Sequence, residues 1–107
     1  MSAAKIRELN DAFRTTMTGG RVMMTSGVQA LGEKTVASVL TAVREFTAFS
    51  AHNDPHGEHD FGSVTLAGRK FFFKLEYYDV AMEFGSEDPA DPSKTTRVLT
   101  IMLASEY

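Results

Sequence analysis

A hairpin pattern in the second half of the chain constrains the fold most. Residues 61–66 and 69–78 have strand composition and flank Ala67-Gly68, which is typical of a two-residue turn. Side chains alternate between the two faces of a strand, so the longer segment is predicted to bury one set on its core face: Phe71, Phe73, Leu75 and Tyr77. Pairing across the turn is expected to place His59 opposite Glu76 and Asp60 opposite Leu75.

The spacing of apolar residues predicts the elements before this hairpin. Apolar side chains recur every three or four residues over 3–17 and over 33–47, which indicates two amphipathic helices. The apolar run at 21–25 predicts a short buried strand. Alternating apolar residues at 80–84 predict a third strand after the hairpin.

The last segment, residues 93–106, is compatible with two structures. It is apolar enough for a buried strand. Asp91-Pro92, however, supplies a helix N-cap followed by proline at the first helical position, so we expect a helix. The order helix-strand-helix-strand-strand-strand-helix then indicates an α+β fold, in which helices pack on one side of a small, mainly antiparallel sheet.

Composition narrows the function classes. A chain of 107 residues is expected to be a single domain, residues 1–107, and the absence of cysteine excludes disulfides and thiolate chemistry. No apolar run is long enough to span a membrane and no signal peptide is visible, so the expected location is the cytoplasm, without a membrane partner. Residues 1–50 hold six Lys/Arg against four Asp/Glu, and residues 51–107 hold five against ten. Without a dense basic patch, nucleic acid is not the expected partner.

The stretch HNDPHGEHD, residues 52–60, contains all three histidines and three carboxylates. Imidazole and carboxylate are the ligands that zinc or manganese accept without thiolate, which makes His56, His59 and Asp60 candidate metal ligands. Pro55 and Gly57 disfavour a helix that would align them. Strand alternation also directs His59 and Asp60 to opposite faces, so the sequence predicts neither a metal site nor a cofactor.

Four residues remain candidates for acid–base chemistry: Glu58, His59, Asp60 and Glu76. The expected pairing puts His59 beside Glu76 on one face, where a carboxylate can make histidine a better proton acceptor, and Glu58 with Tyr77 and Asp60 on the other. No nucleophile motif accompanies them. The structural alternative is a turn in which Asp54 caps backbone amides, followed by a His59–Glu76 cross-strand ion pair.

Four segments together carry a family resemblance: LNDAFRTTMTGGRVMMTSGVQALG, NDPHGEHDFG, YYD and DPADPSKTTRVLTIMLASEY. They resemble domain of unknown function 3768, a family of short bacterial proteins that is frequent in alphaproteobacteria and often encoded on plasmids and integrated mobile elements. The resemblance implies no activity. It implies tolerance of other residues at His56, and it implies these motif residues: Asn53, Asp54, Gly57, Glu58, His59, Asp60 and Phe61.

These observations favour a small, non-enzymatic binding or regulatory protein of a mobile genetic element, with inhibition of a host defence complex as one such role. A protein is the expected partner. The predicted binding surface comprises Asn53, Asp54, His56, Glu58, His59, Glu76, Tyr78 and Asp79. Two alternatives stay open: a metal-assisted hydrolase that uses Glu58, His59, Asp60 or Glu76, and nucleic-acid binding through Phe72, Lys70 and Lys74 on the hairpin.

Overall fold

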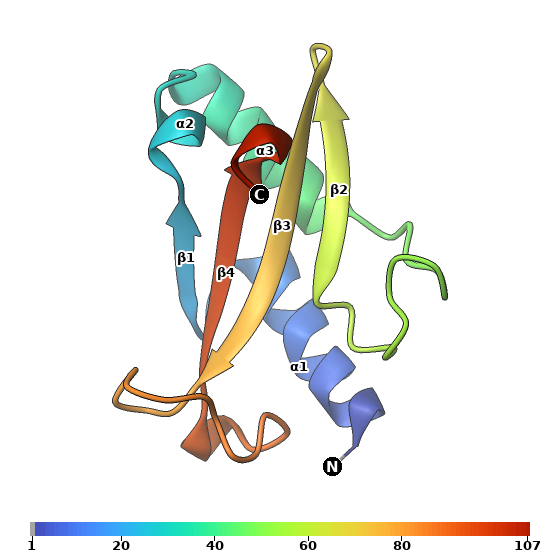
Figure 1. The fold of residues 1–107 in the computed structure, drawn as a ribbon, viewed down its shortest axis with the longest axis vertical. Coiled ribbons are helices and arrows are strands. Elements are labelled where there is room, and N and C mark those ends of the chain that lie inside the picture. Colours follow the sequence, from blue (N-terminus) through green and yellow to red (C-terminus); the bar gives the residue numbers. More distant parts are fainter. Residues whose placement is uncertain (1) are drawn as a thin grey trace.

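A four-stranded sheet forms the middle of the fold, which the computed structural model describes for residues 2–107 (Figure 1). The strands are β1 (Arg21–Met24), β2 (Phe61–Leu66), β3 (Arg69–Tyr78) and β4 (Thr96–Leu103), arranged in the order β1-β4-β3-β2. β3 pairs antiparallel with both of its neighbours, whereas β1 runs parallel to β4. The predicted mainly antiparallel sheet is therefore confirmed.

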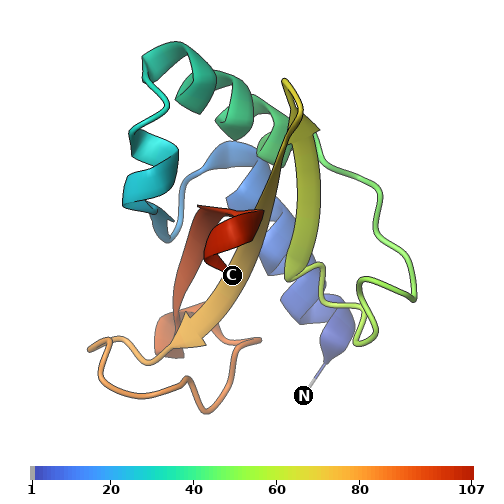
Figure 2. The same cartoon turned by 45° about the horizontal axis from the view of Figure 1, so that its top comes forward.

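Three helices contribute to a core on one face of this sheet. They are α1 (Ala3–Thr16), α2 (Ser26–Gln29) and α3 (Glu33–Glu45). Figures 1 and 2 show α1 and α3 behind the sheet. We call the opposite face the outer sheet face, and no α-helix of comparable length from residues 2–107 lies on it. The core joins side chains of all three helices to those of β3 and β4: Phe13, Val28, Val39, Val43, Phe71, Phe73, Leu75, Leu99 and Ile101. The α+β class is confirmed.

Side chains supply partners for free backbone groups at the start of α1 and at the end of α3. The Ser2 hydroxyl accepts a hydrogen bond from the Lys5 N–H at the start of α1, and Met17 ends the helix in the left-handed conformation. The C-terminus of α3 is held by Arg14, whose Nη1 donates to the carbonyl oxygens of Val43 (2.8 Å) and Phe46 (3.0 Å). No helix within residues 2–107 combines the length and the apolar character needed to cross a membrane.

The hairpin forms with the predicted turn and the predicted register. Ala67 and Gly68 both have positive φ, 51° and 78°, as a two-residue turn of the mirror-image type requires. Phe61 lies opposite Lys74 and Leu66 opposite Arg69. Phe71, Phe73 and Leu75 are buried as expected, whereas Tyr77 is only partly buried. Each large apolar side chain that is fully buried contributes about 1.5–3 kcal/mol to folding.

The helix expected over residues 93–106 is wrong, because this segment forms the central strand β4. Asp91 does cap a turn, accepting from the Ser93 N–H at 2.9 Å, but that turn is only the short 3-10 helix Pro92–Lys94. Beyond it, β4 pairs with β3 on one side and β1 on the other. Its side chains are buried on both faces, and the neighbouring strands supply partners for its backbone, which outweighs the helix propensity of Leu and Met.

The third strand expected over residues 80–84 is also wrong. This segment is a turn, in which the Met82 N–H donates to Asp79 O (3.0 Å) and the Asp79 N–H donates to Phe84 O (2.8 Å). Met82 has a φ of 62°, and only an isolated bridge links Tyr78 to Gly85. The position next to β3 that this segment would need is occupied by β4.

Candidate functional site

The loop that contains HNDPHGEHD is organised around a buried aspartate. The side chain of Asp54 is almost fully buried, and its Oδ1 accepts hydrogen bonds from the backbone N–H groups of Glu58 and His59, both at 3.1 Å. Gly57, at a φ of 68°, closes the turn by donating to Asp54 O. The predicted turn with an aspartate cap is confirmed. Oδ1 of Asp54 is therefore occupied within the loop, and its Oδ2 lies 3.7 Å from His59 Nε2.

His59 does not pair with Glu76, and the cross-strand ion pair expected from the hairpin is wrong. His59 has a φ of 55°, so the chain leaves the path of β2 at this residue. Its ring stacks on Phe49 with the centroids 3.9 Å apart, and its Nδ1 lies 2.9 Å from Oδ1 of Asp11 on α1. Glu76 instead lies on the outer sheet face and pairs with Lys74 at 3.3 Å.

Glu58 and Tyr77 meet as expected, and they belong to a larger buried network. The Tyr77 hydroxyl donates to Glu58 Oε1 at 2.8 Å. Asn10, which is completely buried on α1, donates from Nδ2 to the Tyr77 hydroxyl (2.8 Å) and to Glu58 O (3.0 Å). Its Oδ1 accepts from Arg97 Nε at 2.8 Å. This network, Asn10–Glu58–Tyr77–Arg97, therefore fastens the loop to α1, β3 and β4.

Burial within this network changes the protonation behaviour of two members of the site. The pKa of Tyr77 is raised well above its ordinary value, chiefly by desolvation, so the phenol keeps the proton that it donates to Glu58. Burial, and next the negative charge of Glu58, raise the pKa of Asp60. The Asp60 backbone oxygen accepts from the Leu75 N–H at 2.8 Å, which confirms that the hairpin pairing extends to this residue.

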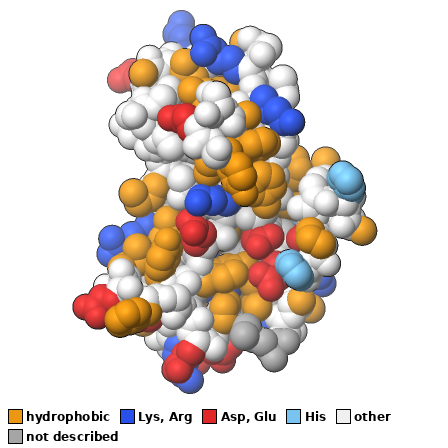
Figure 3. Space-filling view, in the orientation of Figure 1, with side chains coloured by type: hydrophobic (Ala, Val, Ile, Leu, Met, Phe, Trp, Pro, Cys, Tyr) orange, Lys and Arg blue, Asp and Glu red, His pale blue; other side chains and the backbone are white. Residues whose placement is uncertain are grey.

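The remaining predicted site residues are dispersed. His52 and His56 are exposed, whereas His59 is partly buried against α1. Figure 3 shows histidine side chains well apart on the surface. Asn53 and Asp79 make local turn contacts, Asn53 Oδ1 with the Ser50 N–H and Asp79 Oδ1 with the Glu83 N–H. Within residues 2–107, no group of three or more His, Asp or Glu side chains is arranged to hold a metal ion.

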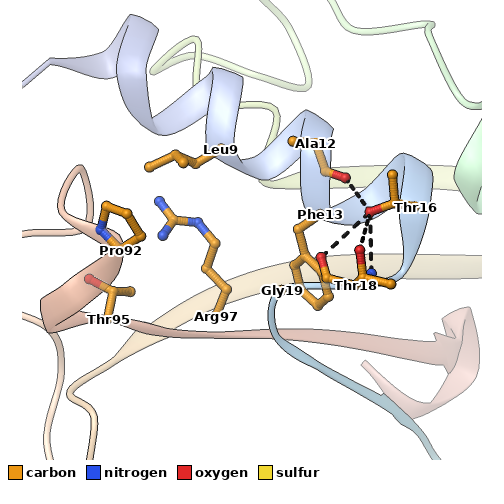
Figure 4. A pocket seen from close by; sticks show the side chains of 9 residues that line it. All are labelled: Leu9, Ala12, Phe13, Thr16, Thr18, Gly19, Pro92, Thr95 and Arg97. Carbon is orange, nitrogen blue, oxygen red and sulfur yellow. Dashed lines mark hydrogen bonds between the residues drawn. The ribbon is translucent and has the colours of Figure 1, made fainter.

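A pocket beside Arg97 lies away from all these predicted residues. It has a volume of about 410 Å³ and is formed by α1, the turn that follows it and the segment before β4 (Figure 4). Among the described residues that line it, Arg97 is the one with a charge, and the others are apolar or carry hydroxyl groups. A second, smaller pocket of about 260 Å³ lies near the start of α3 and the hairpin turn.

Sequence reasoning missed three residues that organise this region: Asn10, Asp11 and Arg97. The only available signal for Asn10 was its position among apolar residues on the buried side of α1, one residue after Leu9. Apolar spacing gives no such signal for Asp11, since a charged residue of an amphipathic helix is expected to face solvent. The position of Arg97 could not be predicted, because residues 93–106 were expected to form a helix rather than a strand.

Comparison with known proteins gives one result. Residues 24–106 match the model of the family described as Protein of unknown function (DUF3768). The chain belongs to this family. Neither a search of curated proteins nor one of solved structures gives a match. The matched residues include Glu58, Tyr77 and Arg97, whereas Asn10 and Asp11 lie on α1 before the match begins.

Proposed function

We propose that this DUF3768 protein is a small, non-enzymatic binding protein of the cytoplasm that contacts a protein partner through its outer sheet face. The observation that carries the proposal is an aromatic cluster on that face. Phe61 and Phe72 lie with their ring centroids 5.1 Å apart, and the ring of Tyr107 contacts both edge-on, at 5.8 and 5.4 Å. Tyr107 is 76% exposed.

The surroundings of this aromatic cluster suit a protein better than a nucleic acid. Met23, on the same face of β1, is 52% exposed, and aromatic residues and methionine are enriched in protein interfaces. Lys70 lies over the Phe72 ring, but the charge of Lys74 is neutralised by Glu76. Figure 3 views this face and shows hydrophobic side chains gathered between charges of both signs. A nucleic-acid surface needs a continuous excess of positive charge.

The non-enzymatic character of the proposal is supported by how the acid–base candidates are used. Glu58 accepts from Tyr77, and His59 is held between Phe49 and Asp11. Neither residue lines the larger pocket. From the binding surface predicted from the sequence, the proposal keeps Glu76 and Tyr78, because alternation along β3 places them on the outer sheet face.

The resemblance to proteins of mobile elements adds a hypothesis about the partner. Small proteins of such elements often inhibit host defence by binding a defence complex, so the first partner to seek is a protein of that kind in the host. The aromatic cluster supports a protein partner of any identity.

The test is affinity capture from the host, followed by titration calorimetry with the purified partner. Met23→Glu and Tyr107→Ser alter exposed positions of the outer sheet face, and Ala37→Glu adds a charge at an exposed position of α3. We expect the first two substitutions to weaken binding by about tenfold or more, as loss of a buried anchor does, and Ala37→Glu to leave it unchanged.

Other outcomes would contradict the proposal. A partner that binds all three variants equally would remove the outer sheet face from the interface. Loss of binding by His56→Asp alone would place the interface on the exposed loop instead. A complex with nucleic acid that is abolished by Phe72→Ala and weakens steeply with salt would favour the nucleic-acid alternative.

A further inference from the structure

The pocket beside Arg97 has the dimensions and the lining of a small-molecule site. Its volume of about 410 Å³ falls within the range of about 300–1,000 Å³ that is common for ligand pockets. Leu9, Phe13 and Pro92 provide apolar walls, and Thr16 and Thr18 place hydroxyl groups at one side (Figure 4). None of these residues belongs to the outer sheet face, so this site is separate from the proposed protein interface.

Arg97 brings a buried positive charge to this pocket without a direct counter-charge. It is 4% exposed, its Nε donates to the neutral amide of Asn10, and its Nη2 donates to the backbone oxygen of Pro89. Among residues 2–107 it forms no ion pair, and its Nη1 donates no hydrogen bond. Figure 4 shows the guanidinium tip among the lining side chains of Leu9, Pro92 and Thr95. A buried charge of this kind is costly unless an anion compensates it.

Two nearby groups moderate the charge but do not neutralise it. The Tyr77 ring lies 5.4 Å below the guanidinium. The pKa of Arg97 is lowered mainly by burial, and Tyr77 and Glu58 oppose this effect only through space. The guanidinium still keeps its proton at neutral pH, because its ordinary pKa lies far above that range. The pocket therefore presents one permanent positive charge next to apolar walls.

We propose that this pocket binds a small monocarboxylate with an apolar body. A single guanidinium balances one negative charge, and its planar nitrogen atoms match the geometry of a carboxylate. A phosphate monoester carries nearly two negative charges at neutral pH and would leave one of them uncompensated in this site. Leu9, Phe13 and Pro92 then contact the apolar body of the ligand.

The experiment uses benzoate as the probe and ¹⁵N-labelled full-length protein. Two-dimensional NMR follows the backbone amides of Thr18 and Gly19 and the Nε–H signal of Arg97 during titration. We expect saturable shifts at these signals with benzoate. Benzamide, which has the same ring without the charge, is expected to bind about tenfold more weakly, since a hydrogen bond to a charged group is the stronger kind.

A matched pair of variants separates occupation of the pocket from general effects on the fold. Ala12 lines the pocket and is exposed on α1, so Ala12→Phe fills the cavity without removing an internal side-chain hydrogen bond. Ala4→Phe makes the same change on the same helix outside the pocket. We expect Ala12→Phe to abolish the benzoate shifts and Ala4→Phe to retain them, with both variants giving the circular dichroism spectrum of the wild type.

Four results with benzoate or benzamide would overturn the proposal. The first is the absence of shifts when benzoate is added at millimolar concentration, in 10-fold excess over the protein, and the second is shifts confined to other residues. The third is binding of benzamide as tight as that of benzoate. The fourth is binding of benzoate by Ala12→Phe that is unchanged from the wild type. Phenyl phosphate and inorganic phosphate are titrated in parallel. Saturation by either phosphate without saturation by benzoate would assign the site to a dianion and refute the monocarboxylate.

Discussion

Asn10 is the residue on which the internal polar network depends most, and replacing it by leucine tests that dependence. Its amide is completely buried and makes three hydrogen bonds, to Arg97 Nε, the Tyr77 hydroxyl and Glu58 O. Leucine has a similar size but can make none of them. The substitution therefore leaves the buried guanidinium N–H of Arg97 and the partly buried carbonyl oxygen of Glu58 without these partners.

The cost of Asn10→Leu can be worked out from these three bonds. The bond to the charged Arg97 contributes about 1.5–3 kcal/mol, and the two neutral bonds contribute about 1 kcal/mol each. Burial of the added apolar surface offsets part of the loss, by about 1 kcal/mol. We expect the free energy of unfolding to fall by about 3 kcal/mol, which is a large fraction of the roughly 5–15 kcal/mol that stabilises a domain.

Urea denaturation followed by circular dichroism measures this change, since the chain has no tryptophan for fluorescence. With an m-value of about 2 kcal/mol/M, the midpoint should fall by about 1.5 M. The control is Gln29→Leu, which replaces an exposed amide that makes one hydrogen bond, and it should cost less than about 1 kcal/mol. A loss below about 1 kcal/mol for Asn10→Leu would refute the idea that this network supports the fold.

Two further predictions concern Gly62 in strand β2 and Asp60, which lies just before this strand. Gly62→Ala should destabilise the protein by about 1–3 kcal/mol in the same urea assay, because an added Cβ would collide with the buried Phe73 ring and lie 2.9 Å from Phe46 Cε1. Ser63→Ala is the control at the neighbouring position. Equal stability of the two variants would contradict this packing. The raised pKa of Asp60 means that the folded state holds this proton more tightly than the unfolded state, so the wild type loses stability as pH rises through the ordinary value of 3.8 towards the folded-state pKa. Asp60→Asn should therefore be more stable than the wild type at pH 7, and this difference should disappear at a pH below the ordinary pKa of aspartate. A difference in stability that does not depend on pH would show that ionisation of Asp60 is not its cause.

Elements governed by local patterns could be predicted from the sequence. The hairpin register followed from Ala67-Gly68 and the alternation along β3, and α1 and α3 followed from apolar spacing. Strand β4 could not be predicted in the same way. Asp91-Pro92 does start a helical turn, but long-range pairing with β1 and β3 takes over after Lys94.

The candidate site could also be predicted only where its contacts depend on local patterns. The Asp54 cap lies within five residues of the amides that it binds, and Glu58 meets Tyr77 across a register that the turn defines. His59 was misplaced because a single residue with positive φ ends the strand geometry. Its actual partner, Asp11, lies 48 residues away on another element.

The sequence by itself determined the hairpin, the two amphipathic helices and the capped turn, since each depends on contacts between residues that are near one another along the chain or across one tight turn. Tertiary structure alone decided that residues 96–103 lie at the centre of the sheet, and this placement carried Arg97 to Asn10 and to the pocket. The physical reason is that a central strand obtains its backbone hydrogen bonds and its burial from distant segments, and no local pattern encodes those partners.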